Sequence, residues 1–162
     1  MKYIIHKKKL QIRQQEYLLN KIHRLPYQKE QWWGDYQVCV FNQDSPDIDP
    51  ALQKAITIIS QMVNVEQNFN TIVIKKIQKG EKIIPHVDSR NTVGKSISIL
   101  LGSFEDARYR MDDTVEEVNP GDIIIQDCTN GYAMGPNYLM YPLQGGTQYA
   151  ITICTILKEN PV

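Results

Sequence analysis

The segment Gly80-Glu81-Lys82-Ile83-Ile84-Pro85-His86-Val87-Asp88 carries the residues best suited to metal chemistry. Ile83 and Ile84 indicate a strand, and residues two apart on a strand point to the same face of a sheet. The imidazole of His86 and the carboxylate of Asp88 would therefore converge on one point, as two ligands of a metal ion do. A structural hydrogen bond between His86 and Asp88, without metal, is the alternative use of the same pair.

Composition sets limits on the setting of this pair. The 162 residues are 42% hydrophobic and 22% charged, enough to bury one core without disulfides or structural metals, so we expect a single domain over residues 1–162. Eighteen basic and 18 acidic residues leave no net charge, which removes any overall attraction to nucleic acid or an anionic membrane. Three irregularly spaced cysteines and the lack of a long apolar run predict a cytoplasmic protein that does not enter a membrane.

The amino-terminal part, residues 1–69, reads as a flank of strands and helices. Its expected elements are a strand over 2–12, a helix with Leu18, Ile22 and Leu25 on one face that ends at Pro26, a short strand over 36–41, and a helix that begins at Asp49-Pro50. The two tryptophans Trp32 and Trp33 precede the short strand and are expected to anchor the core or line a pocket.

From Asn70 onward the pattern changes to short β segments without an intervening helix. They cover residues 71–78, 83–88, 95–101, 107–111, 114–118, 121–126, 137–141 and 148–157, with turns such as Asn119-Pro120-Gly121-Asp122 between them. This succession predicts a mainly β fold with flanking helices, a barrel or a double-sheet jelly roll over residues 70–157.

The order of these features resembles the iron(II)/2-oxoglutarate-dependent oxygenases. The resemblance rests on Gly80 six residues before His86, on Ser96–Leu101, on Asn119–Ile125 and on Gly145–Thr152, and it covers about residues 70–157. The carboxy-terminal segment looks like the prolyl-hydroxylase branch, whereas Phe69-Asn70 and the spacing from Gly80 to His86 are similar to alkylated-base demethylases. The resemblance implies a jelly roll called a double-stranded β-helix. It also implies iron held at the mouth by His-x-Asp and a distal histidine, and an arginine or lysine that binds the remote carboxylate of 2-oxoglutarate.

Only the first two of these family residues are present here. His86 and Asp88 match the His-x-Asp pair, but Tyr138 stands where the distal histidine is expected and Gln148 stands where the arginine is expected. Some relatives place an Asn-x-Tyr pair before the glycine to hold the cosubstrate, and Lys75 and Ile77 occupy those positions.

The replacements alter both the metal site and the cosubstrate site that the resemblance implies. A neutral phenol such as Tyr138 is a poor ligand for iron(II), because the pKa of a phenol is about 10 unless a metal lowers it. Gln148 lacks the charge and the two-pronged geometry of arginine, a loss of roughly 1–3 kcal/mol. Lys75, Arg108 or Arg110 could supply the missing charge from neighbouring strands. A packing role for Tyr138 in a half-buried strand is equally compatible with the sequence, and Cys128 and Met134 are nearby soft donors whose usual place is a core or a loop.

Two functions of different class follow from these residues. The first is an iron-dependent oxygenase that hydroxylates a small molecule or peptide, with iron held by His86, Asp88 and Tyr138, and with the acid of 2-oxoglutarate oriented by Gln148 and a nearby cation, Lys75 or Arg110. The alternative is a catalytically inactive relative that uses the roll to bind a small molecule or another protein. A nucleobase substrate, suggested by Phe69-Asn70, is a third hypothesis that the zero net charge disfavours for duplex nucleic acid.

Overall fold

The computed structural model describes most of the chain. The described residues are 3–32, 34–42, 45, 47–83, 92–105, 107–111, 114–128, 137–139 (backbone only) and 146–157. Within them the elements are β1 (Tyr3–His6), α1 (Ile12–Ile22), β2 (Gln28–Lys29), β3 (Gly34–Asp35), β4 (Gln37–Asn42), α2 (Pro50–Met62), β5 (Thr71–Gln78), β6 (Lys82–Ile83), β7 (Thr92–Phe104), β8 (Ala107–Met111), β9 (Thr114–Val118), β10 (Ile123–Asp127), β11 (Asn137–Leu139) and β12 (Gly146–Ile156).

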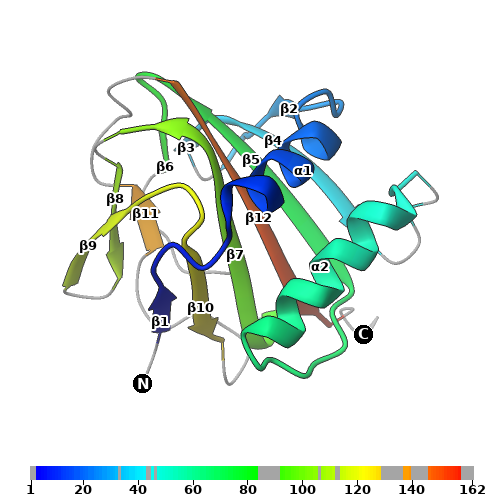
Figure 1. The fold of residues 1–162 in the computed structure, drawn as a ribbon. Helices are drawn as coiled ribbons and strands as arrows, with labels where there is room; N and C mark the ends of the chain where they lie inside the picture. The colour runs from blue at the N-terminus through cyan, green and yellow to red at the C-terminus, as the bar shows by residue number, and fades with distance from the viewer. Residues whose placement is uncertain are drawn as a thin grey trace, which may run out of the picture.

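The strands form one large sheet and two small ones. The large sheet has the order β1-β10-β7-β12-β5-β4-β2, the second β11-β8-β9, and the third pairs β3 with β6. Every pairing is antiparallel, as in a roll whose strands cross from one sheet to the other. The predicted mainly β jelly roll with flanking helices is therefore confirmed. The amino-terminal strands β1, β4 and β2 extend the large sheet at both of its edges (Figure 1).

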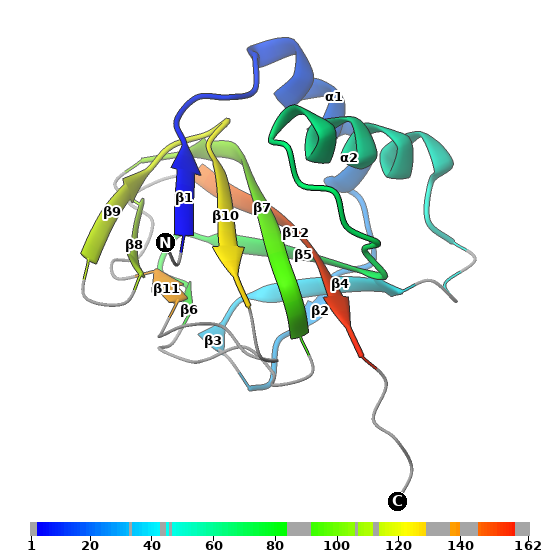
Figure 2. The ribbon, with the colours of Figure 1, turned by 90° about the horizontal axis from the view of Figure 1, so that it is seen from below.

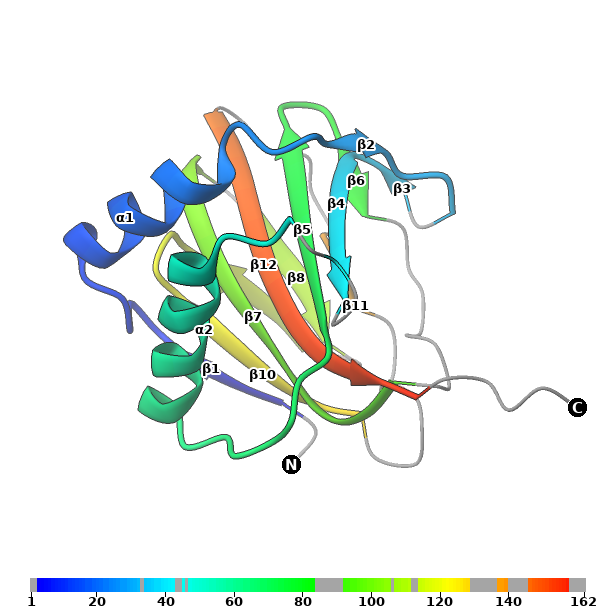
Figure 3. The same ribbon diagram turned by 90° about the vertical axis from the view of Figure 1, so that its right-hand side faces the viewer.

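The large sheet separates two layers of the molecule. Helices α1 and α2 cover one of its faces, and the small sheet of β8, β9 and β11 lies on the other side (Figures 2 and 3). Each side has its own apolar core. Along β12, Tyr149, Ile151 and Ile153 belong to the core under the helices, whereas Ala150 belongs to the core between the sheets. We call the space between the two sheets the interior of the roll.

Helix α2 begins where the sequence predicts. Asp49 lies outside the helix in an extended conformation, its carboxylate accepts a hydrogen bond from the backbone N–H of Ala51 at 2.8 Å, and Pro50 occupies the first helical position. The carboxylate also lies 3.0 Å from the ammonium of Lys21 at the end of α1. Asp49 therefore both caps α2 and joins the two helices.

The predicted strand over residues 2–12 is wrong beyond His6. Strand β1 ends there, and Ile12 already begins α1. The chain turns because Lys8 takes a positive φ of 48° while its backbone N–H donates to the buried carboxylate of Asp122 at 2.7 Å. The same Asp122 carboxylate accepts from the backbone N–H of Asn119 at 2.8 Å, so the predicted turn at 119–122 fastens the entry to α1.

The tryptophans and the strand over residues 83–88 differ from what the sequence predicts or lie partly outside the described residues. Trp32 is 75% exposed, so its predicted role as a core anchor is wrong, and Trp33 lies outside the described residues. The strand predicted over 83–88 is described only up to Ile83, the end of β6, and the rest lies outside the described ranges. Within the described part of the chain no helix is long and apolar enough to cross a membrane.

We predict that Asp49→Ala lowers the midpoint of thermal unfolding at neutral pH by a few degrees, and that Asp49→Asn lowers it less, because asparagine also caps helices. The hydrogen bond with Lys21, followed by that with Ala51, lowers the pKa of Asp49. A lowered pKa in the folded state means that the stabilisation is present above the ordinary carboxyl pKa of about 3.9 and is lost as the pH falls through the lowered value. Circular dichroism melts across this range should show the difference between native protein and Asp49→Asn closing at low pH. Equal midpoints for the two variants at neutral pH would contradict the capping role.

Candidate functional site

The structure describes one of the three predicted metal ligands and not the other two. His86 and Asp88 lie outside the described residues. Tyr138 belongs to β11, where its backbone is paired with Arg110 of β8. The arrangement of these three as iron ligands thus stays a prediction. Among the residues that the structure does describe, no three His, Cys, Asp or Glu side chains gather as they would around a metal ion.

Gln148 lies in the centre of the roll. It is on β12, opposite Ile77 of β5 on one side and Gly102 of β7 on the other, and its side chain is fully buried. Its amide Nε2 donates a hydrogen bond of 2.7 Å to the hydroxyl of Tyr109. The other end of the same amide, Oε1, is buried without a hydrogen-bond partner in the part of the chain that the structure describes. An unpaired buried oxygen is unfavourable for folding, so this position calls for an explanation.

Tyr109 is a further candidate site residue, one that the sequence does not single out. It lies on β8, is 4% exposed, and faces the interior together with Ala107 and Met111 of the same strand. Burial raises the pKa of its phenol, and the hydrogen bond from Gln148 offsets this only in part. The group therefore stays a neutral hydroxyl at physiological pH. The alternation of Ala107, Tyr109 and Met111 with two arginines predicts an inward tyrosine, but nothing local predicts a partner 39 residues away.

The two cations proposed to assist Gln148 are placed differently. Lys75 of β5 is directly opposite Ala150 of β12, two residues from Gln148 and on the same face of the sheet. A diagonal neighbour of this kind lies at roughly 7–8 Å between backbone positions, within reach of a long side chain. Arg110 instead alternates with Tyr109 and Met111, so it is on the other face of β8. Lys75 therefore lies on the same face of the large sheet as Gln148, whereas Arg110 lies on the face of the small sheet that points away from the interior.

The interior grades from a buried end to a half-exposed end. Next to Gln148, the paired residues Leu100 and Ala150 are buried. The next pair on the same face is Ser98 and Thr152, whose hydroxyls are partly exposed and lie 2.9 Å apart. A ligand in the interior would therefore meet hydroxyls and an ammonium near the exposed end, and the amide of Gln148 at the buried end.

Cys128 and Met134 are the remaining candidate donors from the sequence. The thiol of Cys128 is buried and lies 3.8 Å from the hydroxyl of Ser96 and 3.9 Å from the carbonyl of Gln126. Cys39, Cys128 and Cys154 are all buried and form no disulfide with one another. Met134 lies outside the described ranges.

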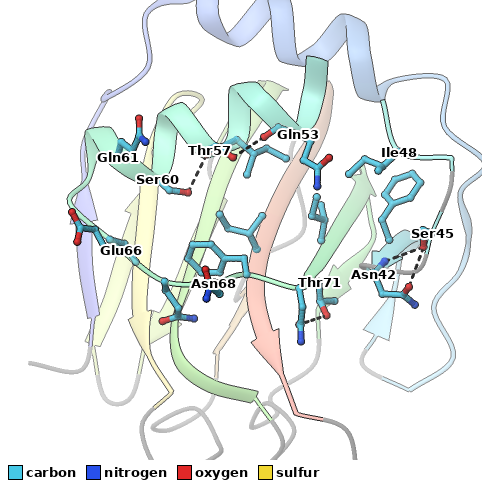
Figure 4. Close-up of a pocket in the computed structure, with 18 residues that line it drawn as sticks. Asn42, Ser45, Ile48, Gln53, Thr57, Ser60, Gln61, Glu66, Asn68 and Thr71 are labelled. Atoms are coloured by element: carbon cyan, nitrogen blue, oxygen red, sulfur yellow. Dashed lines mark hydrogen bonds between the residues drawn. The ribbon is translucent and has the colours of Figure 1, made fainter. Parts of the chain in front are cut away.

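A second candidate region lies on the opposite face of the large sheet. A cavity of about 650 Å³ opens between α2, the segment 65–72 and the carboxy-terminal end of β4. Figure 4 shows Gln53, Thr57 and Ser60 of α2 on one side of it and Asn68 and Thr71 on the other. Apolar side chains complete the lining, among them Phe41, Ile56, Phe69 and Ile153. The volume lies within the range of small-molecule sites, and the lining combines amides and hydroxyls with apolar groups.

We predict that Gln148 and Tyr109 are strongly coupled in stability. Tyr109→Phe alone leaves the Gln148 amide without its partner, and Gln148→Met alone leaves the Tyr109 hydroxyl without one, so each should lower the free energy of unfolding by about 1–3 kcal/mol. The double variant removes both polar groups and should be close to the native protein or more stable. Urea unfolding of the four proteins measures the coupling. Additive losses in the double variant would contradict it.

Comparison with known proteins supports the architecture. Neither a protein-family model nor a curated protein matches the sequence. The structure is similar to the viral collagen prolyl hydroxylase vCPH of Paramecium Bursaria Chlorella virus-1 in its 2OG complex, with a TM-score of 0.70 and 13% identity over 95% of each chain. It is also similar to OsALKBH1, with a TM-score of 0.69 and 12% identity over 94% of this chain and 97% of that one.

A third similar structure is a prolyl hydroxylase from Trichoplax adhaerens in complex with a peptide fragment of hypoxia inducible factor. Its TM-score is 0.65 at 12% identity, over 95% of this chain and 83% of that one. At such low identity the likeness concerns the fold. The chain therefore has the double-stranded β-helix fold of the 2OG-Fe(II) oxygenases, which confirms, for the fold, the resemblance seen in the sequence.

Proposed function

We propose that the protein is an iron(II)-dependent oxygenase of the 2-oxoglutarate dioxygenase superfamily, a hydroxylase whose active site has been altered. The observation that supports this most is the similarity of the fold to such oxygenases over nearly the whole chain. The His-x-Asp pair of His86 and Asp88 is the second support.

Iron is the metal that suits this donor set. An imidazole and a carboxylate together are ligands that iron(II) accepts. Tyr138, a poor ligand as a neutral phenol, is the proposed third ligand in its ionised, tyrosinate form. Bound iron(II) would supply the centre that activates dioxygen. The apolar interior around Leu100, Ala150 and Ile77 would exclude water from the substrate.

The described residues do not suit 2-oxoglutarate in the way that the resemblance implies. Gln148 carries no charge, and its unpaired Oε1 is an acceptor that would face the carboxylate of the cosubstrate. Arg110 is on the far face of β8. Lys75 is the proposed cation nearest to this position, one cross-strand pair away. We therefore assign no step of the reaction to 2-oxoglutarate.

The substrate that we propose is a small molecule or a peptide, and the setting the cytoplasm. One similar structure was solved with a peptide fragment; a nucleobase, suggested by the resemblance of Phe69-Asn70 to alkylated-base demethylases, is the second option. The zero net charge favours the first over duplex nucleic acid.

We predict that the native protein binds about one iron(II) per chain under anaerobic conditions, and that His86→Ala and Asp88→Ala each weaken this binding at least about tenfold, because two remaining ligands hold iron poorly. His23→Ala is the matched control, since this exposed histidine follows α1 and should leave iron binding unchanged. Metal analysis after gel filtration gives the stoichiometry. A native protein that takes up no iron, or one whose uptake is indifferent to His86, would refute the proposed metal site.

Tyr138→Phe tests the third ligand. A tyrosinate bound to iron(III) gives a visible absorption band, so exposure of the iron-loaded native protein to air should produce colour that the variant lacks. The same band in Tyr138→Phe would exclude Tyr138 as its source.

A specific observation favours a second function, that of a catalytically inactive relative that binds a small molecule. It is the cavity of about 650 Å³ under α2, which lies across the large sheet from the interior of the roll. Its polar lining consists mostly of amides and hydroxyls, and Glu66 is the one acidic residue among the lining residues that the structure describes. An uncharged ligand with polar substituents therefore suits it best.

We predict that Thr57→Trp fills this cavity and abolishes binding there. In a thermal-shift screen of sugars, nucleosides and carboxamides, a ligand of the cavity should raise the native unfolding midpoint by a few degrees. The shift should disappear in Thr57→Trp and persist in Lys54→Trp, a matched control on the same helix whose side chain does not line the cavity. A shift that survives in Thr57→Trp would place the ligand elsewhere.

A further inference from the structure

The Gln148–Tyr109 pair presents one acceptor and one donor at the buried end of the interior. Tyr109 accepts the hydrogen bond from Nε2 of Gln148, so the phenolic hydrogen of Tyr109 remains to be donated. In the described part of the chain this hydrogen meets no acceptor, and Oε1 of Gln148 meets no donor. The two unmatched atoms belong to groups in direct contact and are both buried.

A carboxylate cannot match this pattern. Its two oxygens only accept hydrogen bonds, so one would face the Tyr109 hydroxyl and the other would face Oε1 of Gln148, acceptor against acceptor. The surroundings add to the mismatch, because Leu100, Phe104 and Ala150 belong to the same apolar core. Burying a full charge there without a charged partner in contact is unfavourable.

A primary carboxamide matches it at both atoms. Its N–H would donate to Oε1 of Gln148, and its carbonyl would accept from the hydroxyl of Tyr109. We propose that the interior of the roll binds a ligand by an uncharged carboxamide end held between Gln148 and Tyr109, at the position where the resemblance implies a carboxylate. The inference rests on the proposed function only in treating the interior as the ligand site.

Lys75 defines the other end of this ligand. It lies on the same face of the large sheet, one cross-strand pair from Gln148, where the strand becomes half-exposed. Two residues along a strand span roughly 7 Å, a distance that a chain of a few carbons can bridge. The ligand class is thus a monoamide of a short dicarboxylic acid, with its amide end buried and its carboxylate toward Lys75 and the half-buried hydroxyls of Ser98 and Thr152.

The test compares glutaramate with glutarate, two ligands of equal length that differ only in one amide for one carboxylate. Neither has a 2-oxo group, so binding does not require iron, and a failure of the proposed oxygenase activity would leave the result unaffected. In titrations followed by nuclear magnetic resonance, the side-chain amide signal of Gln148, identified by its absence in Gln148→Met, should shift with glutaramate. Glutaramate should bind at least about tenfold more tightly than glutarate, the difference expected for about one hydrogen bond gained and one repulsion avoided.

Three variants sharpen the comparison. Tyr109→Phe should weaken both ligands severalfold, because the amide carbonyl of glutaramate and a carboxylate oxygen of glutarate can each accept from the hydroxyl. Gln148→Arg should reverse the preference toward glutarate, and if this variant does not fold, the native titrations and Tyr109→Phe still decide. Lys75→Met should weaken both ligands equally and keep their ratio. Equal or tighter binding of glutarate by the native protein, or no binding of either ligand, would overturn the proposal.

Discussion

The position of β12 between β7 and β5 is the constraint on which the rest of the structure depends. A strand with neighbours on both sides cannot shift its register by one residue without turning every side chain to the opposite face. Here that register sends Tyr149, Ile151 and Ile153 toward the helices and Ala150 toward the interior. Gln148 thereby enters an apolar core with no freedom to point elsewhere, and β12 has the most extensive pairing in the molecule's described part.

Much of the fold follows from local pattern, because the segments involved obey one period over their whole length. Strands β5, β8 and β9 begin and end where alternation and turn residues predict, and α2 begins at its Asp49 cap. The strand predicted over 2–12 failed for a non-local reason. The turn after His6 depends on the carboxylate of Asp122, more than a hundred residues away, which no pattern within residues 2–12 reveals.

The candidate site divides in the same way. Gln148 could be found from the sequence because a resemblance marks its position, and Lys75 could be named as a cation on a neighbouring strand. The pairing of β5 with β12 then places Lys75 on the same face as Gln148. Arg110 was an equally reasonable sequence choice, but the inward direction of Tyr109 sends it to the other face of β8. The hydrogen bond between Gln148 and Tyr109 joins strands of two different sheets, so only the packing of the sheets on each other creates it.

The hydrogen bond from Gln148 to Tyr109 helps to decide whether the interior of the roll binds a different ligand or no ligand. A position without a ligand is most stable when filled by an apolar side chain that matches the surrounding core. Gln148 instead keeps a buried amide with one unpaired atom beside a buried hydroxyl with an unused hydrogen. This arrangement lowers stability unless a ligand supplies the missing donor and acceptor. A site that retains two complementary polar groups at such a cost is better explained by a changed ligand than by the absence of one.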